Sequence, residues 1–327
     1  SSIFLTGGTG SFGKAFLNRL LKNNPEQSVT IYSRDELKQY NLALALPIEK
    51  FPNIDFVLGD IRDRQRVIQA CEGHSVVVHA AALKHVPAAE RNPTEFIRTN
   101  VDGAQNVISA CSYHGIDKCV ALSTDKACAP INLYGATKLC SDKLFIAANL
   151  SHNKAGTIYS VVRYGNVMAS RGSVIPFFLG FDKKKPLPVT HEEMTRFNIT
   201  LEQSIDTILW ALENCNGGEI VVPKIPSYSI IDLVKAIRGT EDYIVTGIRE
   251  GEKLHEEMIT SSDSLKTVLF GDKYLILPPW IDSGNYKQNY NLKVKIVPMG
   301  FSYSSGLNEE FLTVEQLTEL ISTIKTK

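Results

Sequence analysis

The chain has 327 residues, in which 35 lysines and arginines balance 35 aspartates and glutamates. Single hydrophobic cores stop growing at roughly 250 to 300 residues, so this length favours two unequal lobes. A formal charge of zero excludes a global field that draws the protein to nucleic acid or to anionic lipid, so we expect neither as a partner.

The first half alternates short apolar runs with helical patterns. The predicted strands are residues 3–6, 29–33, 55–58, 75–79, 118–123 and 157–163. Each is nearly all apolar, as a strand covered by helices on both faces must be, and strands separated by helices indicate βαβ units. The predicted fold class is therefore α/β, with a doubly wound parallel sheet and a second, smaller α/β substrate domain.

The second half is less regular. Thr200-x-x-Gln203 and Thr313-x-x-Gln316 are capping boxes that predict helix starts, and residues 219–222 predict another strand. We predict a nucleotide-binding domain from residues 1–165 plus about 198–222. Residues 166–197 plus about 223–327 would form the smaller, sugar-nucleotide-binding domain.

Other whole-chain features exclude further classes. The longest apolar run, residues 76–83, is far below the ~18 residues of a membrane span, and the six cysteines show no metal-ligand spacing. We expect a cytoplasmic protein with reduced thiols and no metal site.

A glycine-rich loop, Gly7-Gly8-Thr9-Gly10-Ser11-Phe12-Gly13, joins the first predicted strand to a helical pattern at residues 14–22. Glycines let the backbone approach a pyrophosphate, whose charge then lies at the helix N-terminus. The loop predicts a dinucleotide cofactor.

The residues at the end of the second predicted strand indicate which dinucleotide is bound, NAD or NADP. An acidic residue there is typical of NAD binding, but Ser33 and Arg34 occupy the position and suit a 2′-phosphate, so NADP is favoured. Arg34 as a solvated loop cation is the alternative. Asp60 is interpreted either as a partner of the adenine amine or as a helix N-cap before Arg62.

Tyr134 and Lys138 are four residues apart and share one face of a predicted helix. The lysine ammonium lowers the pKa of a nearby phenol, so Tyr134 can take a hydroxyl proton during hydride transfer. Asp125 and Lys126 stand just before this helix and suggest an acid and a base, with a structural salt bridge as the alternative. Burial favours the neutral form of both, whereas their mutual attraction opposes it.

These motifs resemble the extended short-chain dehydrogenase/reductases, which have a Rossmann sheet. More narrowly, the segments at 79–87 (HAAALKHVP), 123–127 (STDKA), 132–138 (NLYGATK), 163–166 (RYGN) and 247–249 (GIR) are similar to the inverting UDP-N-acetylglucosamine 4,6-dehydratases, including those of the pseudaminic-acid pathway. Related dTDP-sugar dehydratases that retain the C5 configuration have glutamate where this chain has Lys126. Lysine there favours the inverting group.

The resemblance implies a redox-neutral lyase reaction. Tyr134 deprotonates the sugar 4-hydroxyl as C4 gives hydride to NADP, a neutral Lys126 removes the C5 proton, and Asp125 assists loss of water from C6. Hydride returns to C6, and reprotonation on the opposite face gives UDP-2-acetamido-2,6-dideoxy-β-L-arabino-hexos-4-ulose. Left open are a nucleotide-sugar 4-epimerase or reductase, and a non-catalytic NADP-binding sensor.

The motifs and the resemblance together imply three sets of site residues and a homo-oligomer. The catalytic set is Thr124, Asp125, Lys126, Tyr134 and Lys138. The cofactor set is Thr6, Gly7, Gly8, Gly10, Ser11, Phe12, Gly13, Ser33, Arg34, Asp60, Ile61, Ala80, Ala81, Ala82, Lys84, Asn100, Tyr134 and Lys138. The UDP-sugar set is Lys84, Thr124, Asn166, Arg171, Lys224, Arg249 and Glu252.

Overall fold

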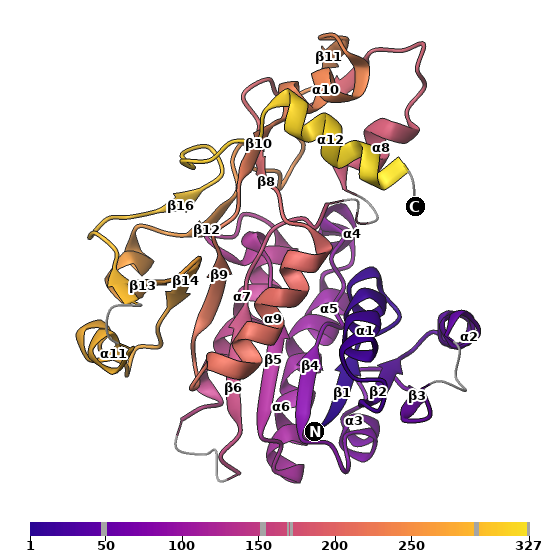
Figure 1. Ribbon diagram of the computed structural model, residues 1–327, viewed down its shortest axis with the longest axis vertical. Coiled ribbons are helices and arrows are strands. Elements are labelled where there is room, and N and C mark those ends of the chain that lie inside the picture. Colours follow the sequence, from indigo (N-terminus) through magenta and orange to yellow (C-terminus); the bar gives the residue numbers. More distant parts are fainter. Residues whose placement is uncertain (47–50, 151–154, 169, 171–172, 291–293, 326–327) are drawn as a thin grey trace.

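The computed structural model describes residues 1–46, 51–150, 155–168, 170, 173–290 and 294–325 (Figure 1). Within these residues a ten-stranded sheet has the order β15-β13-β14-β9-β6-β5-β4-β1-β2-β3. Its parallel strands are β1 (Ser2–Thr6), β2 (Ser28–Ser33), β3 (Ile54–Leu58), β4 (Val76–His79), β5 (Lys118–Leu122), β6 (Ile158–Val162) and β9 (Ile220–Pro223). The doubly wound parallel sheet predicted from the sequence is confirmed, with strand ends shifted by a residue or two.

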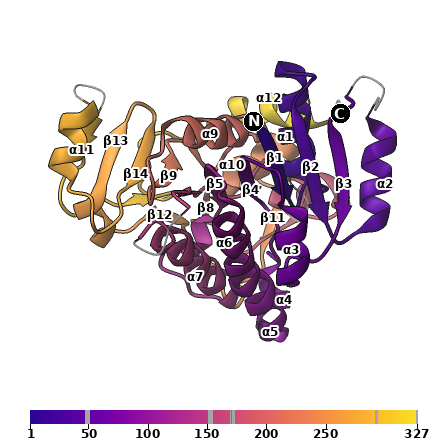
Figure 2. The same cartoon turned by 90° about the horizontal axis from the view of Figure 1, so that it is seen from below.

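Helices cover both faces of this sheet, which explains why its strands are almost entirely apolar. In Figure 2, α1 (Ser11–Asn23) and α9 (Leu201–Asn214) lie over one face, and α3 (Arg64–Ala70), α6 (Gly103–His114) and α7 (Leu133–Ala147) over the other. α2 (Glu36–Ala45) follows β2, and the short helices α4 (Val86–Arg91) and α5 (Pro93–Ile97) lead through a π-helical turn, η2 (Arg98–Asp102), into α6.

Three antiparallel strands extend the sheet beyond β9: β14 (Lys273–Ile276), β13 (Thr267–Phe270) and β15 (Val294–Ile296). The sequence placed this segment in the smaller lobe, but its strands pair with the large sheet because β14 adds alongside β9. η4 (Ser262–Lys266) and α11 (Ser283–Tyr290) flank these strands. The division of the chain into two domains stays a prediction.

A second hydrophobic core forms around α8 (Val174–Gly180), α10 (Ile230–Arg238) and α12 (Val314–Lys325). Small two-stranded sheets lie near it: β8 (Thr195–Phe197) with β10 (Ser227–Ser229), β7 (Leu187–Val189) with β11 (Tyr243–Val245), and β12 (Glu257–Ile259) with β16 (Tyr303–Ser304). The last pair packs its Met258, Ile259 and Tyr303 into the core of the large sheet. β1 starts at the lower end of the molecule in Figure 1, and these elements, here called the second lobe, lie toward the opposite end. They therefore face the carboxyl ends of the parallel strands, where open α/β sheets bind ligands.

Both predicted capping boxes are confirmed. The Thr200 backbone N–H donates to Gln203 Oε1 at 2.9 Å and the Gln203 N–H donates to Thr200 Oγ1 at 3.1 Å. Thr313 and Gln316 form the same reciprocal pair at the start of α12. Among the described helices, none combines the length and the hydropathy that crossing a membrane requires.

Candidate active site

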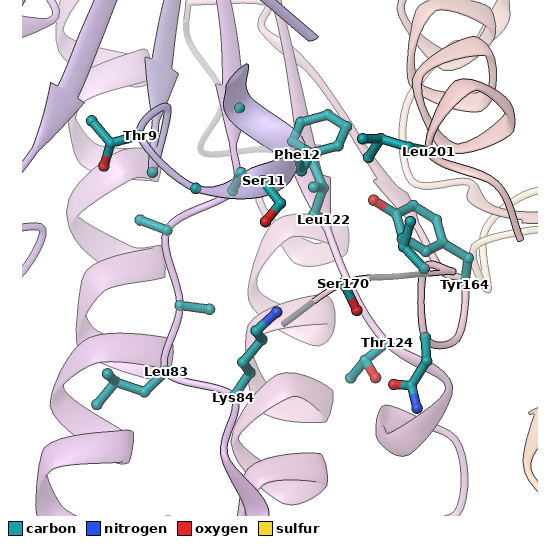
Figure 3. A pocket seen from close by; sticks show the side chains of 18 of the residues that line it. Thr9, Ser11, Phe12, Leu83, Lys84, Leu122, Thr124, Tyr164, Ser170 and Leu201 are labelled. Atoms are coloured by element: carbon teal, nitrogen blue, oxygen red, sulfur yellow. The ribbon is translucent and has the colours of Figure 1, made fainter. Parts of the chain in front are cut away.

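A cavity of about 780 Å³ opens at the carboxyl ends of β1, β2, β4 and β5 (Figure 3). Lys84 reaches into it between the glycine loop and Thr124, while Tyr164 and Leu201 border its far side. The predicted site residues that line it are Gly7, Gly10, Ser11, Phe12, Gly13, Ser33, Arg34, Asp60, Ile61, Ala80, Ala81, Ala82, Lys84, Thr124, Lys126, Tyr134, Lys138 and Asn166.

The glycine loop fits a pyrophosphate. Gly7 has a φ of +68°, and a Cβ there would lie 2.7 Å from the backbone nitrogen of Ala81, so only glycine is accommodated. A Cβ on Gly13 would overlap Gly8. In the described structure no side chain caps α1 at Gly10, and Ser11, Phe12 and Gly13 of its first turn line the cavity, so uncapped amides are available there for an anion.

Two predicted cofactor residues support the cavity wall from behind. The Thr6 hydroxyl accepts from the backbone N–H groups of Ala80 and Ala81 at 3.1 and 3.2 Å. The Asn100 amide brackets Leu83, accepting from its N–H at 2.9 Å and donating to its carbonyl at 2.8 Å. They hold residues 80–83 in place, and like Gly8 they are not among the residues that line the cavity.

Two cations line the cavity near the end of β2, one in the turn after the strand and one in α2. Arg34 is exposed and lines the cavity together with Lys38, which the sequence reasoning missed. The Ser33 hydroxyl accepts from Gln39 Nε2 at 3.0 Å. Asp35, the acidic residue that follows, is the N-cap of α2 and accepts from the Lys38 N–H at 2.9 Å.

Asp60 corrects one sequence interpretation. It is not a helix N-cap, because that role belongs to Asp63, which accepts from the Arg66 N–H at the start of α3. The Asp60 carboxylate instead accepts from the Arg62 backbone N–H at 2.9 Å and from the Arg62 guanidinium at 2.8 Å. It still lines the cavity.

Asp125 and Lys126 lie in a 3-10 turn, η3 (Asp125–Ala127), directly after β5. The Lys126 Nζ donates to Asp125 Oδ1 at 3.2 Å, and the Thr124 hydroxyl donates to the same oxygen at 3.2 Å. Asp125 is buried against Gly165, where an added Cβ would lie 2.5 Å from its Oδ2. Lys126 lines the cavity, and Asp125 lies behind it.

A second carboxylate approaches Lys126 from the second lobe. Glu256, just before β12, places Oε1 at 3.4 Å from Lys126 Nζ, and Arg196 in β8 places Nε at 3.8 Å from the same oxygen. Both side chains are almost completely buried. The sequence reasoning missed Glu256 and Arg196, which no local motif connects to the turn.

From the sequence we expected a neutral Lys126, but the charges of this cluster favour its ammonium form. Burial lowers the pKa of Lys126, but the carboxylates of Asp125 and Glu256 outweigh it and hold that pKa above its ordinary value. Burial raises the pKa of Asp125, although the Lys126 ammonium opposes it. The site thus favours an ammonium at Lys126, and Glu256 adds to the effect of Asp125.

Tyr134 and Lys138 share one face of α7, and both are buried. Burial raises the pKa of Tyr134 to about 12, against the opposing effects of the Lys126 charge and a hydrogen bond with Thr124. The Lys138 Nζ donates to the Leu122 carbonyl at 2.8 Å, and burial lowers its pKa. From the sequence we expected Lys138 to lower the pKa of Tyr134. Burial has the larger effect here and raises that pKa.

The remaining predicted substrate residues lie outside the cavity. Lys224 forms an ion pair with Glu309 at 3.5 Å, and Arg249, which is 74% exposed, pairs with Glu252 at 3.5 Å. Glu252 also lies 3.8 Å from Arg196. Arg171 falls outside the described residues.

The loop that carries Arg249 and Glu252 is tied to the segment after η3. Lys253 Nζ donates to the Cys128 carbonyl at 2.7 Å, and Asn132 Nδ2 donates to the Gly251 carbonyl at 2.9 Å. The second lobe is therefore anchored beside the turn that carries Asp125 and Lys126.

α12 closes one side of the cavity. Leu317 and Ile321 are buried in the core of the second lobe, while Leu320 and Ile324 line the cavity wall. One helix thus joins the second core to the wall of the nucleotide site.

The glycine loop on a doubly wound sheet, with Thr124, Tyr134 and Lys138 at the carboxyl ends of its strands, defines an extended short-chain dehydrogenase/reductase. The chain belongs to the family described as "Polysaccharide biosynthesis protein", whose model matches residues 3–278.

Individual relatives carry two different names. The chain is 49% identical to a Campylobacter jejuni protein named UDP-N-acetylglucosamine 4,6-dehydratase (inverting), over 98% of this chain and 97% of the relative. It is 41% identical to a Rickettsia prowazekii protein named UDP-glucose 4-epimerase, over 99% of this chain and 96% of the relative.

Solved structures agree on the fold. The structure of Pen from Bacillus thuringiensis matches with a TM-score of 0.89 at 33% identity and covers 100% of this chain and 98% of that one. A dTDP-glucose 4,6-dehydratase from Streptomyces venezuelae, determined with NAD bound, matches with a TM-score of 0.67 at 23% identity, over 78% of this chain and 87% of that one, which speaks for the fold alone.

Proposed function

We propose that the protein is an NADP-dependent UDP-N-acetylglucosamine 4,6-dehydratase that inverts C5. The observation that carries the proposal is the Asp125–Lys126 contact of 3.2 Å at the end of β5, beside Tyr134 in the cavity. The 49% identity to a relative of that name supports it. An epimerase needs only the tyrosine and lysine pair, so the acid and base next to it favour the elimination.

The cavity fits a dinucleotide. The glycine loop and the start of α1 would hold its pyrophosphate, and Ser33, Arg34 and Lys38 would hold a 2′-phosphate, which supports NADP. When bound, the nicotinamide supplies a reversible acceptor for one hydride. Every other task falls to side chains of this chain.

Tyr134 would accept the proton of the sugar 4-hydroxyl. In the protein alone its pKa of about 12 is too high for this task at neutral pH. Positive charge beside the phenol favours the phenolate, and the Lys126 ammonium supplies it. Lys138 lies one turn further along the same helix as Tyr134. Thr124 holds the phenol by a hydrogen bond, which fixes where the proton is taken.

Asp125 and Lys126 would act as one acid–base unit. Transfer of a proton along their 3.2 Å contact converts the ion pair into a neutral amine and a carboxylic acid. The amine removes the C5 proton, the electron pair forms the C5–C6 double bond, and the 6-hydroxyl leaves as water with the Asp125 proton. The step ends with an ammonium and a carboxylate, which is the ion pair that the resting site favours.

The second lobe would bind the rest of the UDP-sugar. Asn166 lines the inner part of the cavity, and Arg249, Glu252 and Lys224 lie further out on the second lobe, with Arg171 as a further candidate. A homo-oligomer, a cytoplasmic location and a role in pseudaminic-acid synthesis remain predictions.

The test is to incubate the protein, NADP and UDP-N-acetylglucosamine in heavy water. The expected product has lost the elements of water, carries deuterium at C5 and shows the inverted C5 configuration in its proton couplings. Lys126→Ala should lose C5 exchange, and Tyr134→Phe should lose C4 oxidation as well. Unchanged mass with epimerised C4, from UDP-N-acetylglucosamine or from UDP-glucose, would establish the 4-epimerase instead.

A further inference from the structure

Lys126 has two carboxylate neighbours, and they come from different parts of the fold. Asp125 adjoins it in η3, whereas Glu256 belongs to the second lobe, where β12 packs against η3. The Lys126 Nζ lies 3.2 Å from Asp125 Oδ1 and 3.4 Å from Glu256 Oε1. The two contacts are of similar length, although only Asp125 was expected from the sequence.

Glu256 is held by a hydrogen-bond network of the second lobe. Its backbone N–H donates to Ser305 Oγ at 2.9 Å, and that hydroxyl lies 2.7 Å from Thr195 Oγ1. Thr195 Oγ1 in turn lies 2.7 Å from His255 Nδ1. A buried network of this kind fixes the backbone from which the Glu256 side chain extends, because each member restrains the next.

The Glu256 carboxylate is ionised and incompletely paired. Burial raises its pKa, but the charges of Lys126 and Arg196 outweigh burial and lower it. Oε1 contacts both cations, whereas Oε2 is buried and accepts no hydrogen bond from any described residue. A buried carboxylate oxygen without a hydrogen bond destabilises the folded protein. Its presence here therefore suggests that Glu256 has a role in the function of the site.

The charges of Lys126, Glu256 and the charged groups in direct contact with either of them balance. Two carboxylates, Asp125 and Glu256, face two cations, Lys126 and Arg196. The phenols of Tyr134 and Tyr228 also border the cluster, and both have raised pKa values because they are buried. A proton transfer from Lys126 to either carboxylate leaves the net charge of the cluster unchanged, but the pKa of Asp125 is raised whereas that of Glu256 is lowered. Asp125 is therefore the better proton acceptor, and Glu256 keeps its charge.

We propose that Glu256 is a positioning residue for Lys126: it holds the amine in place from the second lobe and stabilises the ammonium that forms when the C5 proton is taken. The proposal rests on the proposed function, because it assigns Glu256 to the elimination step and not to hydride transfer. It also makes the elimination depend on the packing of the second lobe against η3.

The first test is independent of the reaction. The Lys126 side chain is labelled with carbon-13, assigned with Lys126→Met, and titrated by NMR in the protein without ligands. In the wild type the ammonium form persists above the ordinary lysine value of 10.5, and in Glu256→Gln the titration moves down by about 1–3 units. Glu257→Gln is the matched control, since the neighbouring Glu257 faces Lys253 and Asp263 instead.

The second test separates the two steps of turnover. With UDP-N-acetylglucosamine, Glu256→Gln should slow water loss and C5 exchange roughly 10- to 100-fold, while the initial rise of reduced cofactor at C4 oxidation is kept. Glu256→Asp retains the charge and should recover part of both effects, which also covers the case in which Glu256→Gln does not fold.

The outcomes distinguish the two proposals. An unshifted Lys126 titration in Glu256→Gln or a loss of C4 oxidation equal to the loss of water elimination overturns the role of Glu256 and leaves the dehydratase assignment intact. A wild-type protein that releases no water from the sugar nucleotide overturns the proposed function, and with it the role of Glu256 in that reaction.

Discussion

Gly165 offers a test of how tightly the acid must be placed. An alanine Cβ at this position would lie 2.5 Å from Asp125 Oδ2, so the carboxylate would have to recede by about 0.9 Å to reach the 3.4 Å where ordinary contact begins. Asp125 is 1% exposed and is bound on its other oxygen by Lys126 and Thr124. It therefore cannot recede without lengthening the contact to Lys126.

We expect Gly165→Ala to slow water loss roughly 100-fold, because a displacement of about 1 Å in a positioned catalytic group costs that much. C4 oxidation should continue, since Tyr134 lies on α7 and does not depend on the Asp125 rotamer. The assay follows product mass for water loss and absorbance of the reduced cofactor for C4 oxidation. Gly180→Ala is the control, because nothing lies within 4 Å of the added Cβ there.

Full dehydration activity in Gly165→Ala would refute the reasoning, since it would mean that the Asp125–Lys126 contact is not needed for elimination. Loss of both steps together with a lowered melting temperature would show a general packing defect. The thermal melt of each variant therefore accompanies the kinetics.

Two further predictions concern binding and stability. Arg34→Ala should weaken NADP binding about tenfold or more in isothermal titration calorimetry, because a charge-assisted hydrogen bond contributes about 1.5–3 kcal/mol, and an equal loss for NAD would contradict the 2′-phosphate assignment. Burial lowers the pKa of His79 to about 3 from its ordinary 6.5, so only the unfolded chain takes up this proton as the pH falls below 6.5, and stability is lost in that direction. Urea unfolding at pH 7 and pH 5 should show the wild type losing about 2 kcal/mol more than His79→Asn, and an equal loss in both would exclude His79 as the cause.

Local sequence patterns predicted the parts of the structure that depend on neighbouring residues. The glycine loop after β1, the capping boxes at Thr200 and Thr313, and the shared face of Tyr134 and Lys138 all follow from spacings of a few residues. The contact between Asp125 and Lys126 could be predicted for the same reason, because the two residues are adjacent in the sequence.

Other features depend on residues that only the tertiary fold brings together. Glu256 reaches Lys126 because β12 packs against η3, and Arg196 of β8 contacts Glu256 in turn. Neither residue lies in a motif that predicts its partner. The pairing of β14 with β9 was not predicted for a similar reason, since short runs such as β13 and β14 do not specify the strand beside which they pair. Asp60 and Asp63 also could not be told apart from the sequence. Asp63 caps α3, whereas Asp60 accepts from the Arg62 N–H, and only the backbone geometry decides which of the two is the cap.

The position of α12 bears on how long a cofactor stays bound. Leu320 and Ile324 place an apolar wall beside the nucleotide cavity, and the same helix is anchored in the second core by Leu317 and Ile321. A movement of the second core would therefore also move this wall. In the proposed reaction the hydride returns to the sugar within each cycle, so the dinucleotide would not need to be exchanged between turnovers. An ordinary dehydrogenase must exchange it every time. A wall that is part of a second core would therefore carry no kinetic penalty in this reaction.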